Sequence, residues 1–237
     1  MRSPSSTHTR NTAKRRRPSV APACVICHWR GAAWALVETR PGRQERLRCP
    51  SCQCLLRDRL IWQLLAVGFG SSTRLRVVEV GGTRRLGDRL RAVYDYVNAD
   101  TTEEHARVDA PIDNGRLPLP DASRDAVILS HVLSSIPERS IRTRLLSELR
   151  RVVVNGGRLL MFDDTEFSVH SHRTLRSGAY FHVQRLGRAV LEELVETGWA
   201  YQVVTNCAVA TELGAAREMP YVMAVARGLV VDTRLQT

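Results

Sequence analysis

The chain has 237 residues, enough for one sizeable core or for a small module attached to a domain of about 200 residues. Its 43% hydrophobic and 25% charged residues are ordinary for a globular protein, and no apolar run reaches the roughly 18–20 residues that span a bilayer. The formal charge of +11 suggests a polyanionic partner, yet residues 1–22 alone hold six basic residues and no acid. The other +5 lies in more than 200 residues, so the composition favours a solvated tail over a nucleic-acid surface.

Composition divides the chain into four parts. Residues 1–22 are predicted to be a disordered basic tail, and residues 23–56 hold five of the six cysteines in a small unit. Residues 57–70 are predicted to be a linker helix, and residues 71–237 the main domain. The few small residues between the basic run and Cys24 are too short for a signal peptide, so clustered thiols indicate a reducing, cytoplasmic setting.

Two CxxC pairs separated by 21 residues define the small unit. Each pair turns two thiolates toward one point, and four thiolates suit a tetrahedral Zn²⁺ with no position left open for catalysis. The spacing therefore predicts a structural zinc ribbon, and the alternative is surface thiols or a redox pair. His28 and Cys54 lie close enough to substitute for a ligand. The predicted ligands are Cys24, Cys27, Cys49 and Cys52.

Buried apolar runs alternate with helical periodicities through the main domain. Strands are predicted at residues 77–80, 94–98, 106–108, 125–130, 158–162, 199–205 and 221–226. Helices are predicted at residues 57–67, 86–92, 141–152 and 186–197, with an Asn-Gly-Gly turn at residues 155–157. This order predicts an α/β fold, a Rossmann-like doubly wound sheet of seven strands with an antiparallel last strand.

A glycine turn follows the first of these strands. Gly81 and Gly82 allow a ligand to approach the backbone, and Glu79 precedes them by two residues. Asp100 lies 19 residues beyond Gly81, where a carboxylate can accept both hydroxyls of a ribose. The pattern predicts an adenosine-containing cofactor without separating NAD from S-adenosylmethionine.

A longer series of residues resembles the class I S-adenosylmethionine-dependent methyltransferases of the methyltransferase type 11 kind. Residues 49–59 (CPSCQCLLRDR) and 181–187 also resemble segments of a bacterial subgroup with an N-terminal cysteine segment. The match runs in order over roughly residues 24–205, which makes chance agreement of separate motifs improbable. Besides Asp100 and Asp109, the matching residues are Leu117, Pro118, Pro120, Asp121, Ser123, Asp125, His131, Val132, Leu133, Glu148, Arg151, Val152, Gly156 and Gly157.

The resemblance implies a site for S-adenosylmethionine. Glu79, Gly81 and Gly82 would line its methionine part, Asp100 its ribose and Asp109 its adenine. Ser130 would face the cofactor, and His131, whose ordinary pKa suits proton transfer near neutrality, is the candidate general base. An equally weighted alternative is that His131 caps the strand end or contacts the cofactor alone.

Two departures from the family pattern bear on activity. Thr83 and Arg84 stand in the glycine-rich loop, and Ser134 and Ser135 stand where relatives carry Glu and His. The expected function is therefore methyl transfer, to a small molecule in preference to RNA, with the oligomeric state open. The alternative is a catalytically weakened binding protein that holds nucleic acid or protein through the zinc ribbon and tail. An NAD-dependent oxidoreductase would leave the residues from 125 to 157 unexplained.

Overall fold

The computed structural model describes residues 21–40, 43–69, 74–101, 107–162, 175–177, 180–182, 187–204 and 221–226. Nearly all of the predicted basic tail lies outside these ranges. Within them, no helix is long and apolar enough to cross a membrane.

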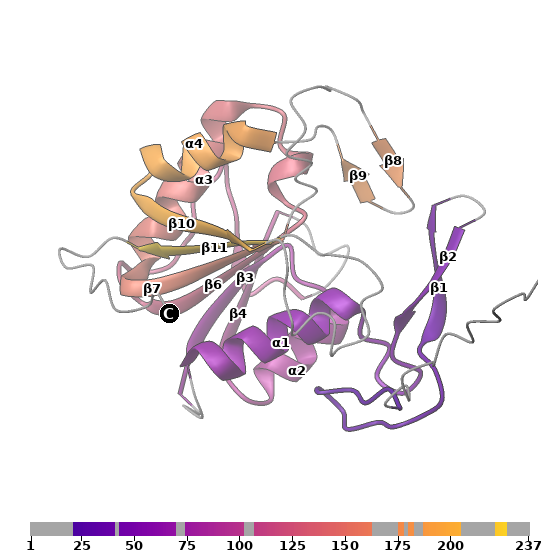
Figure 1. Ribbon diagram of the computed structural model, residues 1–237. Helices are drawn as coiled ribbons and strands as arrows, with labels where there is room; N and C mark the ends of the chain where they lie inside the picture. The colour runs from indigo at the N-terminus through magenta and orange to yellow at the C-terminus, as the bar shows by residue number, and fades with distance from the viewer. Residues whose placement is uncertain are drawn as a thin grey trace, which may run out of the picture.

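A seven-stranded sheet forms the centre of the molecule (Figure 1). Its strand order is β10-β11-β7-β6-β3-β4-β5. From β7 to β5 the five strands are parallel, whereas β11 runs antiparallel to both β7 and β10. The strands are β3 (Arg76–Val80), β4 (Asp95–Asp100), β5 (Ala110–Pro111), β6 (Arg124–Ser130), β7 (Val153–Phe162), β10 (Trp199–Val204) and β11 (Tyr221–Ala226).

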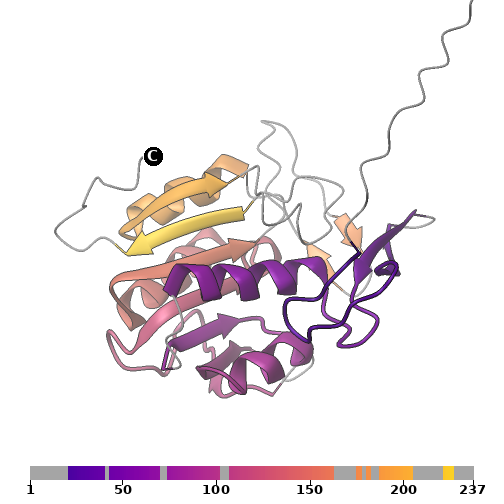
Figure 2. The same cartoon turned by 60° about the horizontal axis from the view of Figure 1, so that its bottom comes forward.

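Two helices cover each face of the sheet, as Figures 1 and 2 show. Helices α1 (Leu56–Phe69) and α2 (Arg84–Arg91) lie on one face, and α3 (Arg139–Val152) and α4 (Gly187–Glu196) on the other. The central strands β3 and β6 are therefore buried on both sides, which explains why they are apolar without alternation. This arrangement is the predicted α/β, Rossmann-like, doubly wound fold.

Sheet register brings three predicted site residues to one edge. Val80 of β3 is paired with Ala99 of β4 on one side and with Leu129 of β6 on the other. Gly81, Asp100 and Ser130 each come one residue later. Because the strands are parallel, all three lie at the carboxyl edge, where open α/β sheets bind ligands.

Two local predictions need correction. The edge strand predicted at residues 106–108 is β5, whose Ala110 is paired with Ala99. Its two-residue length gives almost no periodic signal. The predicted turn at residues 155–157 lies inside β7, because the pairing with β6 passes from Val153 to Arg158 across a bulge in which Gly156 has a φ of +79°.

The cysteine unit contains an antiparallel hairpin that the sequence analysis did not predict. Its strands are β1 (Ala35–Arg40) and β2 (Arg43–Arg48). Elsewhere in the chain, a second small hairpin joins β8 (Leu175–Ser177) to β9 (Tyr180–His182). The described part of the unit shares its core with the sheet: Cys49 and Cys54 belong to the same buried cluster as Leu60 of α1 and Leu86 of α2.

Candidate cofactor site and metal centre

Gly81 begins the turn after β3. Its φ is +70°, and its N–H donates to the carbonyl of Ala99 over 3.1 Å. A Cβ atom here would lie 2.6 Å from Cγ2 of Val132, which follows β6. Both the left-handed backbone and the contact require glycine, so the ends of β3 and β6 approach more closely than any side chain would permit.

A buried polar cluster lies directly beneath Gly82. The Gly82 N–H donates to Oδ1 of Asn98 over 3.1 Å, and the Tyr96 hydroxyl donates to Oε2 of Glu79 over 2.6 Å. A Cβ on Gly82 would be 2.5 to 2.8 Å from the oxygen atoms of all three side chains. The cluster thus supports the turn from below, and the absence of a side chain at Gly82 leaves room for the three polar side chains.

Glu79 is the ionisable centre of this cluster and is only 2% exposed. Burial raises the pKa of its carboxyl to about 7, against the opposing effect of the Tyr96 hydrogen bond. Its position under the turn gives it a supporting role. Direct contact between Glu79 and the methionine part of a cofactor stays a prediction.

Asp100 ends β4 and is partly exposed at the carboxyl edge. Its Oδ1 accepts the Thr101 N–H over 2.7 Å, which orients the carboxylate at the strand end. Its predicted contact with a ribose is untested, but an acid at this edge is placed as that contact requires.

Asp109 has three donors around it. Its carboxylate accepts the Asn98 N–H over 2.9 Å, pairs with Arg91, and lies 3.2 Å from Nε of Arg107. Burial acts to raise the pKa of this carboxyl, but the Asn98 N–H and the Arg91 guanidinium outweigh it and hold the pKa below its usual range. Asp109 therefore ties β4 and α2 to the start of β5, and an adenine contact would have to share its oxygens with these donors.

Ser130 ends β6 next to the turn at Gly81, and His131 is the first residue after this strand. Ser130 is 8% exposed, and its hydroxyl is buried without a hydrogen-bond partner among the described residues. His131 has a φ of +56°, unusual for a residue with a side chain, and its N–H donates to the Phe162 carbonyl over 2.7 Å. The backbone thus turns sharply at the point where the predicted base stands.

The departures from the family pattern also have definite places. Arg84 and Arg85 are exposed in the first turn of α2, which begins at Arg84. Ser134 is fully buried in a short 3-10 helix, η1 (Leu133–Ser135), and the Ser135 hydroxyl donates to the Val132 carbonyl over 2.6 Å. Both serines thus belong to the local packing of this segment.

Two cavities of about 430 and 360 Å³ lie away from this edge. One is lined by Asp121 and Arg150, the other by Phe69 and Gly157, so both lie at the amino ends of the strands. Neither is lined by a predicted cofactor residue, so they give no reason to move the candidate site.

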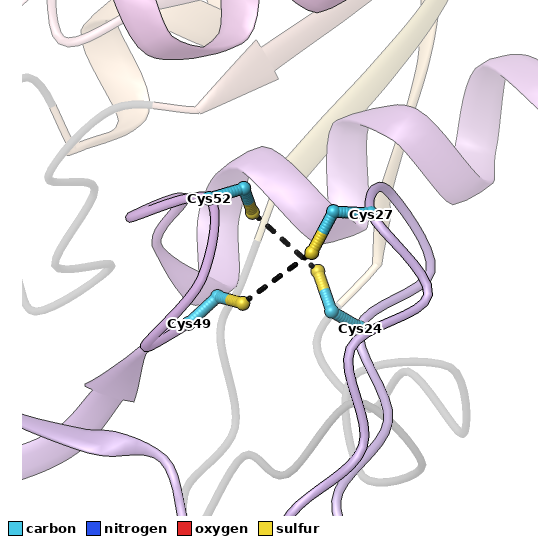
Figure 3. A group of neighbouring side chains, drawn as sticks. All are labelled: Cys24, Cys27, Cys49 and Cys52. Carbon is cyan, nitrogen blue, oxygen red and sulfur yellow. Dashed lines mark hydrogen bonds between the residues drawn. The ribbon is translucent and has the colours of Figure 1, made fainter.

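The four predicted metal ligands converge (Figure 3). All four Sγ atoms lie within 4.8 Å of one another, with Cys24 and Cys52 3.7 Å apart and Cys27 and Cys49 3.6 Å apart. Bonds of about 2.3 Å in a tetrahedral zinc site place the sulfur atoms about 3.8 Å apart. The cluster therefore has the size that a tetrathiolate zinc requires.

The two CxxC knuckles have the same backbone. The N–H of His28 donates to the Cys24 carbonyl over 2.8 Å, and the N–H of Gln53 donates to the Cys49 carbonyl over 3.0 Å. His28 and Gln53 both have a φ near +60°. The other possible ligand, Cys54, is buried outside the cluster, with its Sγ 3.9 Å from the Arg85 carbonyl oxygen.

Sequence reasoning missed Tyr96, Asn98 and Arg59. Tyr96 and Asn98 are two residues apart on β4, so they share a face, and Asn98 is paired with Glu79 in the sheet. Polar residues at alternate positions beside a buried acid were the available signal. Arg59 ends the segment at residues 49–59 that resembles the bacterial subgroup, but no sequence signal indicated its burial, because its surroundings come from segments far apart in the chain.

Comparison with known proteins agrees with this geometry. Residues 66–161, from within α1 to the end of β7, match a family described as a methyltransferase domain. No curated protein sequence is significantly similar to the chain. The fold is α/β and Rossmann-like, part of it matches the methyltransferase domain, and four cysteines are clustered near the N-terminus.

Solved structures with a similar fold include three bacterial and archaeal proteins. The YcgJ protein of Bacillus subtilis is 14% identical, with 70% of this chain and 97% of that chain covered and a TM-score of 0.49. An S-adenosylmethionine-dependent methyltransferase of Mesorhizobium loti is 17% identical (73% and 100% covered, TM-score 0.48). One of Methanosarcina mazei is 12% identical (70% and 97% covered, TM-score 0.49).

Proposed function

We propose that the protein transfers a methyl group from S-adenosylmethionine to an acceptor. The observation that carries the proposal is the meeting of Gly81, Asp100 and Ser130 at the carboxyl edge of three adjacent parallel strands. One feature of this edge fits a bound cofactor: the Ser130 hydroxyl is buried and has no hydrogen-bond partner among the described residues.

Each residue has a distinct role in this proposal. The bound cofactor supplies a methyl group made electrophilic by its sulfonium, and the protein supplies proximity and orientation. Asp100 would hold the ribose hydroxyls, the turn at Gly81 and Gly82 would hold the methionine part, and Asp109 would meet the adenine. His131 would take the proton that the acceptor loses as its bond to the methyl carbon forms.

For the acceptor we propose a small molecule. His131 and Ser130 emerge from a sheet edge of the type at which open α/β folds hold small ligands. The thiols of the five described cysteines are free, and we propose the reducing cytoplasm as the setting.

We further propose that Cys24, Cys27, Cys49 and Cys52 hold one structural Zn²⁺. Four thiolates close the coordination shell, so the ion has no open position for a substrate and contributes to folding. The sulfur spacing and the matching backbones of the two knuckles support this assignment.

Calorimetry with S-adenosylhomocysteine, the product form of the cofactor, tests the enzymatic proposal on the full chain. We expect saturable binding by the unmodified protein and at least a tenfold loss in Asp100→Ala, because the ribose contact is removed. Asp113→Ala, in the loop after β5, is the matched control and should bind as the parent does. Absence of binding at millimolar S-adenosylhomocysteine would refute the proposed methyltransferase activity.

A binding function is the second candidate, and the distribution of charge favours it. Residues 1–60 hold 13 basic and three acidic residues, whereas residues 61–237 hold 22 and 21. The charge outside the tail is therefore concentrated in the cysteine unit, contrary to the even spread expected from composition. Arg85, exposed on α2, lies beside this unit through the contact of its carbonyl with Cys54.

Fluorescence anisotropy with a single-stranded RNA oligonucleotide tests this second function. Binding that weakens steeply with salt, and weakens again in Arg84→Glu and Arg85→Glu, would support it. The matched control is Arg116→Glu, which changes an exposed arginine in the segment that follows β5. An equal effect of all three substitutions would indicate attraction by net charge alone.

A further inference from the structure

Arg59 is a fully buried arginine beside the four clustered cysteines. It lies in the first turn of α1, seven residues after Cys52, and its exposure is 0%. Burying a guanidinium is costly unless negative groups lie near it. The groups around Arg59 should therefore show which negative charge it compensates.

The contacts of Arg59 join both halves of the cysteine unit. Its Nη1 donates to the Cys54 carbonyl over 3.1 Å, and the same carbonyl accepts the Cys49 N–H over 2.9 Å. Its guanidinium carbon lies 3.8 Å above the ring centre of Trp34, the residue just before β1. Arg59 is thereby held in one orientation by the second knuckle on one side and by the approach to the hairpin on the other.

The charge of the proposed metal centre accounts for a buried cation at this position. Four thiolates around a divalent ion leave a net charge of −2, and Cys24 and Cys49 are both buried. Burial lowers the pKa of the Arg59 guanidinium, and the sulfur atoms of Cys24, Cys49 and Cys52, which are negative when they bind a metal, oppose this effect. The nearby carboxylate of Asp58, which accepts the Leu55 N–H over 2.8 Å, adds further negative charge. A buried tetrathiolate centre needs a cation close by, and Arg59 is a buried cation in that place.

We propose that Arg59 is the counter-charge of the metal centre: a positioning residue that makes a buried, doubly negative zinc tetrathiolate stable. Its planar guanidinium suits the role, because it stacks on Trp34 and donates to the Cys54 carbonyl at once. The inference rests on the proposed zinc site and adds to it a residue outside the coordination shell. Outer-shell partners of this kind change metal affinity by about 10- to 100-fold.

Metal competition on the full-length protein tests the proposal. Zinc is titrated against a chromogenic chelator, and Co²⁺ is bound in its place so that the visible spectrum reports the tetrathiolate geometry. We expect Arg59→Met to bind zinc about 10- to 100-fold more weakly, and Arg59→Lys to recover most of the loss because it keeps the charge. Arg57→Met, two residues earlier on α1, is the control and should match the parent.

The outcomes separate the inference from the zinc site itself. A parent protein that takes up no zinc would refute the metal centre, whereas equal zinc affinity in the parent and Arg59→Met would refute the role of Arg59 alone. An equal loss in Arg57→Met would also refute it. If Arg59→Met fails to fold, Arg59→Lys decides: stoichiometric zinc with less than a tenfold loss supports the proposal, and a zinc-free protein overturns it.

Discussion

Arg142 of α3 and Glu193 of α4 form a buried, bidentate ion pair, with Nη2 to Oε1 at 2.6 Å and Nε to Oε2 at 3.1 Å. The Arg142 side chain is 6% exposed and the Glu193 side chain is 0% exposed. Arg142 also donates from Nη1 to the carbonyls of Ile136 and Pro137. The pair thus joins the two helices of one face to the loop that follows η1, close to the candidate base.

Breaking this pair should be costly. In Glu193→Gln the Arg142 charge stays buried without a counter-charge, and we expect the free energy of unfolding to fall by about 3–5 kcal/mol. Urea denaturation measures the change. Glu196→Gln is the control, because the Arg139–Glu196 pair is more than half exposed on both sides and should contribute about 0–1 kcal/mol. Similar losses of unfolding free energy in the two variants would contradict the expectation that the buried ion pair contributes more than the exposed one.

Glu79 should make stability depend on pH. In the folded chain its carboxyl keeps a proton up to about pH 7, whereas the unfolded chain loses it near pH 4.5. Between these values the folded state binds more protons, so the free energy of unfolding should fall as pH rises, on the order of 3 kcal/mol. Burial is the main cause of this raised pKa and Asp58 adds to it, whereas the Tyr96 hydrogen bond and the Arg57 charge oppose it.

The variant Glu79→Gln removes this dependence while keeping an acceptor for the Tyr96 hydroxyl. We expect it to melt above the parent at pH 8 and close to the parent at pH 5. Glu138→Gln, an exposed acid before α3, should leave the profile of the parent unchanged. The same pH dependence in Glu79→Gln and the parent would show that another group is responsible.

Removal of the proposed zinc should destabilise the whole molecule. Cys49→Ser should abolish stoichiometric zinc and lower the melting temperature by about 10 °C or more, since metal binding contributes to folding. Because Cys49 shares a buried cluster with Leu60 and Leu86, calorimetry should show one displaced transition. Cys207→Ser is the matched control and should retain the metal. An unchanged melting temperature in Cys49→Ser would exclude a structural role.

Backbone strain at Ala122 can be relieved by substitution. This exposed residue has a φ of +47°, in the left-handed region that disfavours side chains. We expect Ala122→Gly to stabilise the protein by about 0.5–1 kcal/mol in denaturant titrations. Ala92→Gly, at the C-terminus of α2 with a φ of −73°, should instead cost about 0.5–1 kcal/mol. Changes of the same sign would show that φ does not govern these positions.

The family motifs predicted the fold well because most of their residues build the scaffold. Arg151 donates to the carbonyls of Leu117 and Leu119 and pairs with Asp121 and Glu148. These interactions fasten the end of α3 to the loop before β6, at the edge opposite the candidate site. Motif residues that are fixed by such local networks can be identified from sequence and still say little about chemistry.

Asp125 shows the same point. Its carboxylate accepts hydrogen bonds from the Arg76 N–H, Nε and Nη2, over 2.9, 3.0 and 2.7 Å. It thereby sets the start of β6 against β3. The polar support under Gly82 and the burial of Arg59 could not be predicted in this way, because they depend on side chains from segments that meet only in the folded chain. The hairpin of β1 and β2 was missed because its sequence mixes charged residues with few apolar ones.

The continuity of the cluster that runs from Cys49 and Cys54 to Leu86 and Leu90 has a practical consequence for handling the protein. A fragment cloned from residue 71 onward, the start of the main domain predicted from the sequence, would expose the apolar sides of α2 and the sheet to water. Such a fragment should aggregate during expression, whereas one that starts ahead of Cys24 should remain dispersed. The cysteine unit is thus part of the smallest piece of this chain worth purifying.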